Sequence, residues 1–210
     1  MVIIGAKGFA KEILEILYKN GDTEDLCFYD DITDDIPSLL YGRFPVLRSE
    51  GEIIRNFKDV NPSFALGIGN PKLRYKLCEK FQALGGNLIS TISNRADIGN
   101  FEVKLGMGCN ILDGAKISND VKIGIGVIIY YNSIITHDVE IGDFAEISPG
   151  AILLGRCKVG AFTQIGAGAI VFPNVKVGNN VIIGAGAVVR NNIPSNSVAV
   201  GTPARVIKQN

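Results

Sequence analysis

Aliphatic residues recur at every sixth position through the second half of the chain. From Leu105 to Val189 no step of six misses, and the residue four positions after each is mostly small and almost always uncharged. A period of six fits neither an α-helix, which repeats near 3.6, nor an alternating strand, which repeats every two residues. The pattern predicts a solenoid of short strands separated by tight corners. The aliphatic series is Leu105, Ile111, Ile117, Ile123, Ile129, Ile135, Ile141, Ile147, Leu153, Val159, Ile165, Val171, Val177, Ile183 and Val189.

Three strands and three corners make one triangular coil of about eighteen residues, so the repeat predicts about five stacked coils. Coils should stack at the strand spacing, roughly 4.8 Å, so that each aliphatic side chain covers its counterpart in the next coil. A glycine often follows the aliphatic residue, which suits corners that need a positive φ or a close approach between backbones. These glycines are Gly124, Gly142, Gly160, Gly166, Gly178 and Gly184.

The first part of the chain alternates short apolar runs with helical patterns. Strands are expected at 2–4, 26–29, 64–68 and 88–89, with one helix ending at Gly21 and another starting at Asn70-Pro71. Such alternation predicts a small parallel sheet of Rossmann type, which binds ligands at the carboxyl ends of its strands. The sequence therefore predicts an α/β domain over residues 1–90 and a β-helical domain with a short tail over residues 91–210, whose first coil is irregular near Asn100.

The expected strand ends carry glycines and carboxylates. Gly5 and Gly8 form a G-x-x-G turn and not the full dinucleotide fingerprint, so a nicotinamide cofactor is not expected. Amides at the helix start can hold a phosphate, and Asp30 or Asp31 can accept hydrogen bonds from a base or ribose. The alternatives are a purely structural glycine turn and a solvated acidic turn.

The chain has a single histidine, His137, two residues after Ile135 and directly before Asp138. It falls where a strand meets a corner, so it should point outward, where the solenoid needs no histidine for packing. Asp138 can fix the tautomer and stabilise the imidazolium, which is the arrangement of a general base. The alternative is a lone surface histidine. One coil later lies Gly155, which either leaves space beside the imidazole for a slender ligand or is only a corner glycine.

The composition of the chain limits the kinds of partner that it can bind. The formal net charge is zero, which argues against nucleic acid or an anionic membrane as the main partner. The four cysteines lack close-pair spacing and read as buried residues of a reducing compartment. No charged leader or long apolar segment is evident, so a soluble cytoplasmic protein without membrane insertion is expected. No metal is expected. A β-helical carbonic anhydrase is the metal-dependent alternative, and it needs three histidines at its zinc site, whereas this chain has one histidine.

Seven motifs, taken together and in order, resemble the sugar O-acyltransferases and nucleotide-amino-sugar N-acetyltransferases of the sialic acid and bacillosamine pathways. The resemblance covers nearly the whole chain. It implies a Rossmann-like sugar-nucleotide-binding domain, a left-handed β-helix of hexapeptide repeats, and a homotrimer with active sites in grooves between subunits. The motifs are Gly5-Ala6-Lys7-Gly8, Phe28-Tyr29-Asp30-Asp31, Gly67-Ile68-Gly69-Asn70 with Arg74, Thr136-His137-Asp138, Ser148-Pro149-Gly150-Ala151, Ile183-Gly184-Ala185-Gly186-Ala187 and Gly201-Thr202-Pro203-Ala204.

The resemblance also implies roles for individual residues. His137 would be the general base and Asp138 its support. The acetyl-CoA site would include Glu146, Gly155, Ala167 and Ala185. The nucleotide-sugar site would include Lys7, Gly8, Phe9, Asp30, Asp31 and Gly69.

Three positions depart from the family pattern, which usually has histidine at Phe9, asparagine at Tyr130 and a second histidine at Glu146. An ionised Glu146 cannot donate to a thioester carbonyl, and Phe9 and Tyr130 make the sugar pocket narrower and less polar, which favours a deoxygenated sugar. We therefore predict an acetyl-CoA-dependent N-acetyltransferase acting on a nucleotide-linked 4-amino-deoxy sugar. The alternatives are O-acetylation of sialic acid or another sugar hydroxyl, and a non-catalytic scaffold. The nucleotide, the sugar, the acyl group and the pathway stay open.

Overall fold

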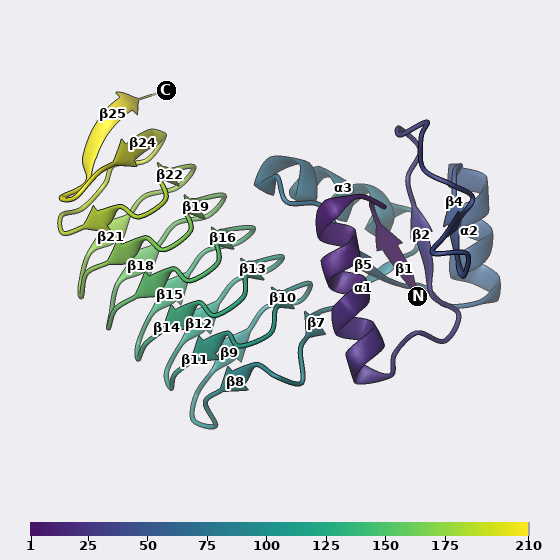
Figure 1. Ribbon diagram of the computed structural model, residues 1–210, viewed down its shortest axis with the longest axis horizontal. Coiled ribbons are helices and arrows are strands. Elements are labelled where there is room, and N and C mark those ends of the chain that lie inside the picture. The colour runs from purple at the N-terminus through teal and green to yellow at the C-terminus, as the bar shows by residue number, and fades with distance from the viewer. Residues whose placement is uncertain (210) are drawn as a thin grey trace. The chain divides into compact units, whose positions relative to one another are not determined.

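The computed structural model describes residues 1–209, which form two compact units (Figure 1). One unit comprises Met1–Thr91, and the other begins at Ile92. The longest helices in the described residues have 13 residues, and none has the length and apolar character that a bilayer crossing requires.

The first unit is a six-stranded sheet with three helices. The strand order is β3-β4-β2-β1-β5-β6, and every pair is parallel except the β3–β4 hairpin. The strands are β1 (Val2–Ile4), β2 (Cys27–Tyr29), β3 (Leu39–Leu40), β4 (Phe44–Leu47), β5 (Ser63–Leu66) and β6 (Asn87–Leu88), and the helices are α1 (Gly8–Asn20), α2 (Glu50–Asp59) and α3 (Pro71–Ala83). Strands β1 and β2 are buried along their whole length, as their uninterrupted apolar sequences require in a parallel sheet.

Local signals set the helix ends in this unit. Helix α1 ends at Gly21, whose φ of 86° is left-handed, and α3 begins at Asn70, whose side chain accepts from the backbone N–H of Leu73 at 3.0 Å. Gly67 allows close packing, because a Cβ there would lie 2.7 Å from the Cβ of Ala10 and 2.8 Å from the carbonyl oxygen of Ile4.

The sequence prediction omitted α2 and the β3–β4 hairpin. A readable signal for α2 was present, since Ser49 and Glu52 form a capping box in which the serine accepts from the Glu52 N–H and the glutamate accepts from the Ser49 N–H. The hairpin has only two- and four-residue strands, and the exposed Pro45 interrupts its apolar pattern.

The second unit is a left-handed parallel β-helix, as the six-residue period predicts for the solenoid and the resemblance for its hand. Each strand pairs with the strand one coil later, as Ile111 with Ile129 and Ile129 with Ile147. A final antiparallel pair, β24 with β25, ends the stack.

The strands form three sheets, one for each side of the prism (Figure 1). One contains β7 (Thr91–Ile92), β10 (Asn110–Ile111), β13 (Ile128–Ile129), β16 (Glu146–Ile147), β19 (Gln164–Ile165), β22 (Ile182–Ile183), β24 (Ser197–Val200) and β25 (Arg205–Gln209). The next contains β8 (Asp97–Ile98), β11 (Lys116–Ile117), β14 (Ile134–Ile135), β17 (Ile152–Leu153), β20 (Ile170–Val171) and β23 (Val188–Val189). The last contains β9 (Lys104–Leu105), β12 (Lys122–Ile123), β15 (Glu140–Ile141), β18 (Lys158–Val159) and β21 (Lys176–Val177).

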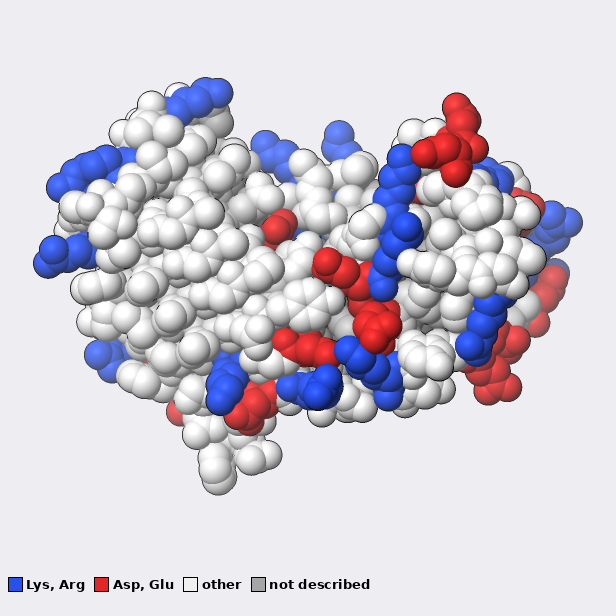
Figure 2. All heavy atoms as spheres, in the orientation of Figure 1, with Lys and Arg blue, Asp and Glu red and all other residues white. Residues whose placement is uncertain are grey.

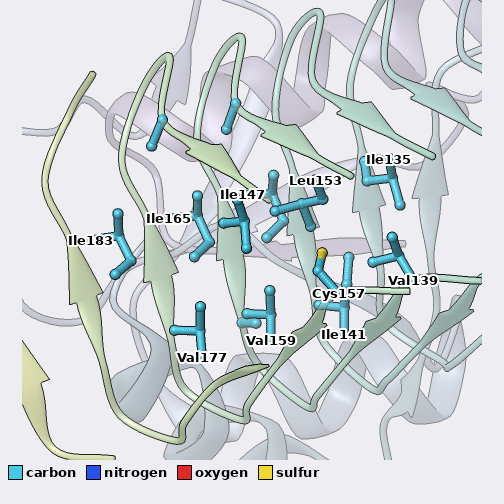
Figure 3. Packing of buried hydrophobic residues seen from close by; sticks show 14 of the residues in the cluster. Ile135, Val139, Ile141, Ile147, Leu153, Cys157, Val159, Ile165, Val177 and Ile183 are labelled. Carbon is cyan, nitrogen blue, oxygen red and sulfur yellow. The ribbon is translucent and has the colours of Figure 1, made fainter. Parts of the chain in front are cut away.

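The second residue of most repeat strands points inward and builds the core. Figure 3 shows Ile147, Ile165 and Ile183 in equivalent places in successive coils, and each is at most 1% exposed. Full burial of one such side chain stabilises the fold by about 1.5–3 kcal/mol. The cysteines at small repeat positions, Cys109 and Cys157, lie inside this core.

The glycines that follow the aliphatic residues serve close approach and not a positive φ. A Cβ on Gly142 would lie 2.6 Å from the backbone nitrogen of Ala161, and one on Gly166 would lie 2.6 Å from that of Ala185. The positive φ falls two residues later, at the third position after each inward aliphatic residue. The residues there are Gly108, Gly114, Asp120, Gly126, Asn132, Asp138, Phe144, Gly150, Arg156, Phe162, Gly168, Asn174, Asn180 and Gly186.

The outward residues give the three sides of the prism different characters. The charged face carries Lys104, Lys122, Glu140, Lys158 and Lys176. The apolar face begins with the charged Asp97 and Lys116 and then carries Ile134, Ile152, Ile170 and Val188. The mixed face carries Ile128, Glu146, Gln164 and Ile182. Figure 2 shows a broad area over the repeat unit with no charged side chain.

Candidate functional site

His137 lies on the corner that joins the apolar face to the charged face, directly after β14. Its side chain is 54% exposed, and its Nδ1 lies 2.7 Å from Oδ2 of Asp138. When Nδ1–H donates to this carboxylate, the lone pair of Nε2 is free to accept a proton. This contact is the one that a general base supported by a carboxylate would need, and the catalytic role of the pair stays a prediction.

Asp138 also has a backbone role. Its φ of 61° places it at the left-handed corner position, which aspartate and asparagine adopt more readily than most residues. Its N–H donates to the carbonyl oxygen of Asn119 in the preceding coil at 3.2 Å. The corner geometry and the carboxylate beside the imidazole thus depend on the same residue.

Gly155 lies beneath the imidazole of His137, so the predicted empty space is not there. A Cβ on Gly155 would lie 2.6 Å from Cε1 and 2.7 Å from Nε2 of the ring. The ring itself occupies the room that the missing side chain leaves. Gly155 has no positive φ, so this close contact is what requires glycine, and a ligand arm cannot pass between the two.

The structure divides the four predicted acetyl-CoA residues between different parts of the prism. Gly155 is on the corner of His137, whereas Ala167 and Ala185 are exposed on the corner between the mixed and apolar faces. These two alanines are in adjacent coils, and the N–H of Gly186 donates to the carbonyl oxygen of Ala167 at 2.8 Å. The two corners flank the apolar face.

Glu146 lies on the mixed face as a hydrogen-bond acceptor. Gln164 donates from Nε2 to one carboxylate oxygen at 3.1 Å, and the Ser148 hydroxyl donates to the other at 3.4 Å. Both donors suit an ionised carboxylate, which has no proton to offer a thioester carbonyl.

The first unit contains a cavity of about 320 Å³ at the carboxyl ends of β1, β2 and β5. All six residues predicted for the nucleotide-sugar site line it: Lys7, Gly8, Phe9, Asp30, Asp31 and Gly69. Sequence reasoning missed other lining residues, including Ile32, Thr33, Leu73 and Leu77. Leu73 and Leu77 belong to α3, which turns them toward the cavity.

Asp30 and Asp31, at the end of β2, accept hydrogen bonds from different partners. Oδ1 of Asp30 accepts from the N–H groups of Ile32 at 3.2 Å and Thr33 at 2.9 Å, and so closes a local turn. Asp31 accepts from the Tyr29 hydroxyl at 2.8 Å. Burial, and then this hydrogen bond to Asp31, raise the pKa of Tyr29 far above its usual value, so the hydroxyl stays a donor.

Two arginines, Arg48 and Arg74, hold the loops of this cavity. Arg48 donates to the carbonyl oxygens of Asp30 at 2.9 Å, Thr33 at 2.6 Å and Ile36. Arg74 is fully buried and donates to the carbonyl oxygens of Ile68 and Gly69. Both guanidiniums fix backbone that lines or adjoins the cavity.

No group of three or more His, Cys, Asp and Glu side chains within residues 1–209 is placed to hold a metal ion.

Comparisons with known proteins cover both units. The family described as "PglD N-terminal domain" matches residues 1–81, and "Bacterial transferase hexapeptide (six repeats)" matches residues 156–191. No curated protein sequence matches the chain.

Among solved structures, PerB from Caulobacter crescentus, crystallised with CoA and GDP-perosamine, is 31% identical with a TM-score of 0.90, over 99% of this chain and 96% of that one. The acetyltransferase domain of PglB from Neisseria gonorrhoeae is 29% identical with a TM-score of 0.88, over 98% of both chains. WeeI from Acinetobacter baumannii is 27% identical with a TM-score of 0.87, over 98% of both chains. The chain therefore belongs to the hexapeptide-repeat acyltransferase family.

Proposed function

We propose that this enzyme transfers an acetyl group from acetyl-CoA to the amine of a nucleotide-linked 4-amino-deoxy sugar. The β-helix would be the acyltransferase domain, and the first unit the sugar-nucleotide-binding domain. The observation that carries the proposal is the His137–Asp138 pair, oriented at 2.7 Å on an outward corner. The likeness to PerB, which was crystallised with CoA and GDP-perosamine, supports the substrate class.

In this mechanism Nε2 of His137 removes a proton from the sugar amine while the nitrogen attacks the thioester carbonyl. The C–N bond forms, the C–S bond breaks, and the proton passes from the imidazolium to the sulfur of CoA. A backbone amide stabilises the oxyanion, since Glu146 already accepts two hydrogen bonds and has none to donate. General-base assistance of this kind contributes roughly 10² to 10⁴ in rate.

The cysteines support direct transfer without a covalent enzyme intermediate. All four are buried. Burial raises the pKa of the Cys157 thiol to about 12 and that of the Cys27 thiol to about 11. A buried thiol that stays protonated is a poor nucleophile.

The cavity of the first unit suits the acceptor nucleotide sugar. Backbone amides at the start of α1, near Gly8, would bind phosphate, and Asp30 and Asp31 would accept hydrogen bonds from a base or ribose. Phe9 presents an aromatic ring where the family usually has histidine, which favours a sugar that lacks a hydroxyl. Among residues 1–209 the ion-pair partner of Lys7 is the exposed Asp35, at 3.6 Å, so Lys7 is available to a phosphate at little cost.

Three copies of the chain would complete the acetyl-CoA site. Gly155 lies on one corner and Ala167 and Ala185 on another, with the apolar face between them, so packing of apolar faces would bring unlike corners of two copies together. Exposed apolar faces of this kind mark interfaces, and closed symmetry buries them. We expect light scattering to give three times the chain mass, and Ile152→Lys on this face to lower that mass; a monomer in the wild type would contradict the assembly.

The function is tested by offering acetyl-CoA with GDP-, UDP- and dTDP-linked amino sugars, beside CMP-sialic acid and free sialic acid, and measuring the products by mass spectrometry. We expect one acetyl group on an amino sugar and none on the sialic acids. Acetylation of a hydroxyl alone would overturn N-transfer. A protein that acetylates nothing, and whose melting temperature acetyl-CoA does not raise, would be a scaffold. The cytoplasmic location stays a prediction.

A further inference from the structure

One corner of the β-helix carries a column of side chains that begins beside the catalytic histidine and ends at a cation. Strands β14, β17, β20 and β23 pair in register, so Ile135, Leu153, Val171 and Val189 are stacked in successive coils. The residues directly after them are therefore stacked as well, and they are Thr136, Leu154, Phe172 and Arg190. Their order from His137 outward is polar, apolar, aromatic and cationic.

Arg190 is an exposed guanidinium held over an aromatic ring. It lies 5.8 Å from the centroid of Phe172, which is itself 36% exposed. In the described part of the chain Arg190 has no carboxylate partner, whereas Arg156 on the same corner is bonded to Asn174 at 2.9 Å. A cation stacked on a ring and unpaired in the protein is well placed to meet an anionic ligand.

The length of the column matches the pantetheine arm of CoA. Three coil steps separate the level of Thr136 from that of Arg190, which at the usual strand spacing is about 14 Å. About thirteen covalent bonds separate the thioester sulfur of CoA from its first phosphorus, and an extended chain covers roughly 3.5 Å for every three bonds. The arm therefore spans roughly 15 Å, so a thioester beside His137 places the pyrophosphate at the level of Arg190.

The opposite direction along the same corner is acidic. One coil before Asp138 lies Asp120, and Glu102, Asp120, Asp138 and Glu140 line one shallow pocket together with two lysines. Carboxylates there would repel the phosphates of CoA, whereas Arg190 would attract them. The charge pattern thus favours a donor that extends from His137 toward Arg190.

We propose that Arg190, held by the ring of Phe172, binds the pyrophosphate of the acyl-CoA donor and selects CoA thioesters over shorter thioesters. The proposal rests on the acetyl-CoA-dependent function proposed above. Charge-assisted hydrogen bonds to phosphate are about twice as strong as neutral ones, so the contribution should appear in the KM of the donor and little in kcat.

The test compares three donors in the wild-type enzyme and in Arg190→Gln: acetyl-CoA, acetyl-dephospho-CoA, which keeps the pyrophosphate, and acetyl-pantetheine, which has no phosphate. We expect Arg190→Gln to raise KM about tenfold for the first two, to leave KM for acetyl-pantetheine unchanged, and Arg190→Lys to restore part of the loss. The matched control is Lys176→Gln, which removes the same charge from the charged face and should change none of these constants.

Three results would overturn the assignment. Equal KM values of wild type and Arg190→Gln for acetyl-CoA would exclude a role for Arg190, and an equal loss with acetyl-pantetheine would mean that the phosphates are not its target. An effect that disappears with acetyl-dephospho-CoA would place Arg190 at the 3′-phosphate instead of the pyrophosphate. Failure of the proposed function is distinguishable, because the wild type would then transfer acetyl from no donor, and both proposals would fall.

Discussion

Replacing His137 with alanine is expected to lower kcat at least a hundredfold, since the variant has no base to take the proton from the attacking amine. The fold should be preserved, because the side chain is 54% exposed and packs on a glycine at the prism surface. Steady-state kinetics with the acceptor identified by mass spectrometry would measure the loss. Circular dichroism, oligomer mass and acetyl-CoA-induced stabilisation should match the wild type.

Asp138→Asn is the companion variant that separates the carboxylate from the corner. Asparagine adopts the left-handed conformation as aspartate does, so the φ of 61° is kept while the negative charge is lost. We expect an intermediate loss of kcat with unchanged melting temperature. Near-wild-type kcat in His137→Ala would refute the assigned base, whatever the result for Asp138.

Gly155→Ala is expected to lower kcat by about a hundredfold, although it removes no group that reacts. The new methyl carbon would lie 2.6–2.7 Å from Cε1 and Nε2 of His137, so the ring must move by about 1 Å to restore van der Waals contact. A displacement of this size at a reacting group costs on the order of 10² in rate. The backbone at Gly155 accepts alanine, because its φ is not positive.

The control for Gly155→Ala is the same change made in the His137→Ala background. If the methyl group acts only through the imidazole, it has no further effect on the residual activity there, and the double-mutant cycle shows strong coupling. Additive losses would mean that Gly155 serves the reaction by another route, such as direct contact with the thioester. Gly51→Ala in α2, where a Cβ meets nothing within 4 Å, checks that a glycine-to-alanine change alone is harmless.

The β-helix was predictable because its signal is periodic and every period repeats the same physical requirement. The inward aliphatic residues, the small residues four positions later and the outward His137 could all be read by counting. The glycines were harder to interpret. Both a positive φ and a close backbone approach select glycine, and only coordinates show that Gly142 or Gly166 serves the second.

The lining of the cavity in the first unit was predictable only where it follows strand ends. Gly5 to Phe9, Asp30, Asp31 and Gly69 come directly after apolar runs, so their meeting at one edge follows from parallel topology. Arg48 lies in a stretch with no such pattern, and its three backbone contacts depend on the path of the loop from Asp30 to Ile36. Contacts between a side chain and carbonyl groups far away in the chain produce no periodic pattern in the sequence.

The residues predicted to bind acetyl-CoA show a different limit. Gly155 and Ala185 occupy the same kind of position, the second after an inward aliphatic residue, but they belong to different corners because their coils are counted from different strands. The six-residue repeat shows directly where a residue lies within its corner. To know which of the three corners it belongs to, one must also count strands along the chain, because every third strand returns to the same side of the prism.

The constant rise of the coils makes the β-helix a molecular ruler. Inserting or removing one complete coil between His137 and Arg190 would shift these residues relative to each other by about 4.8 Å while leaving every corner, ladder and core layer in register. Under the role proposed for Arg190, adding or removing whole coils would change the donor length that fits the enzyme in steps of about 4.8 Å and would leave the residues at both ends unchanged.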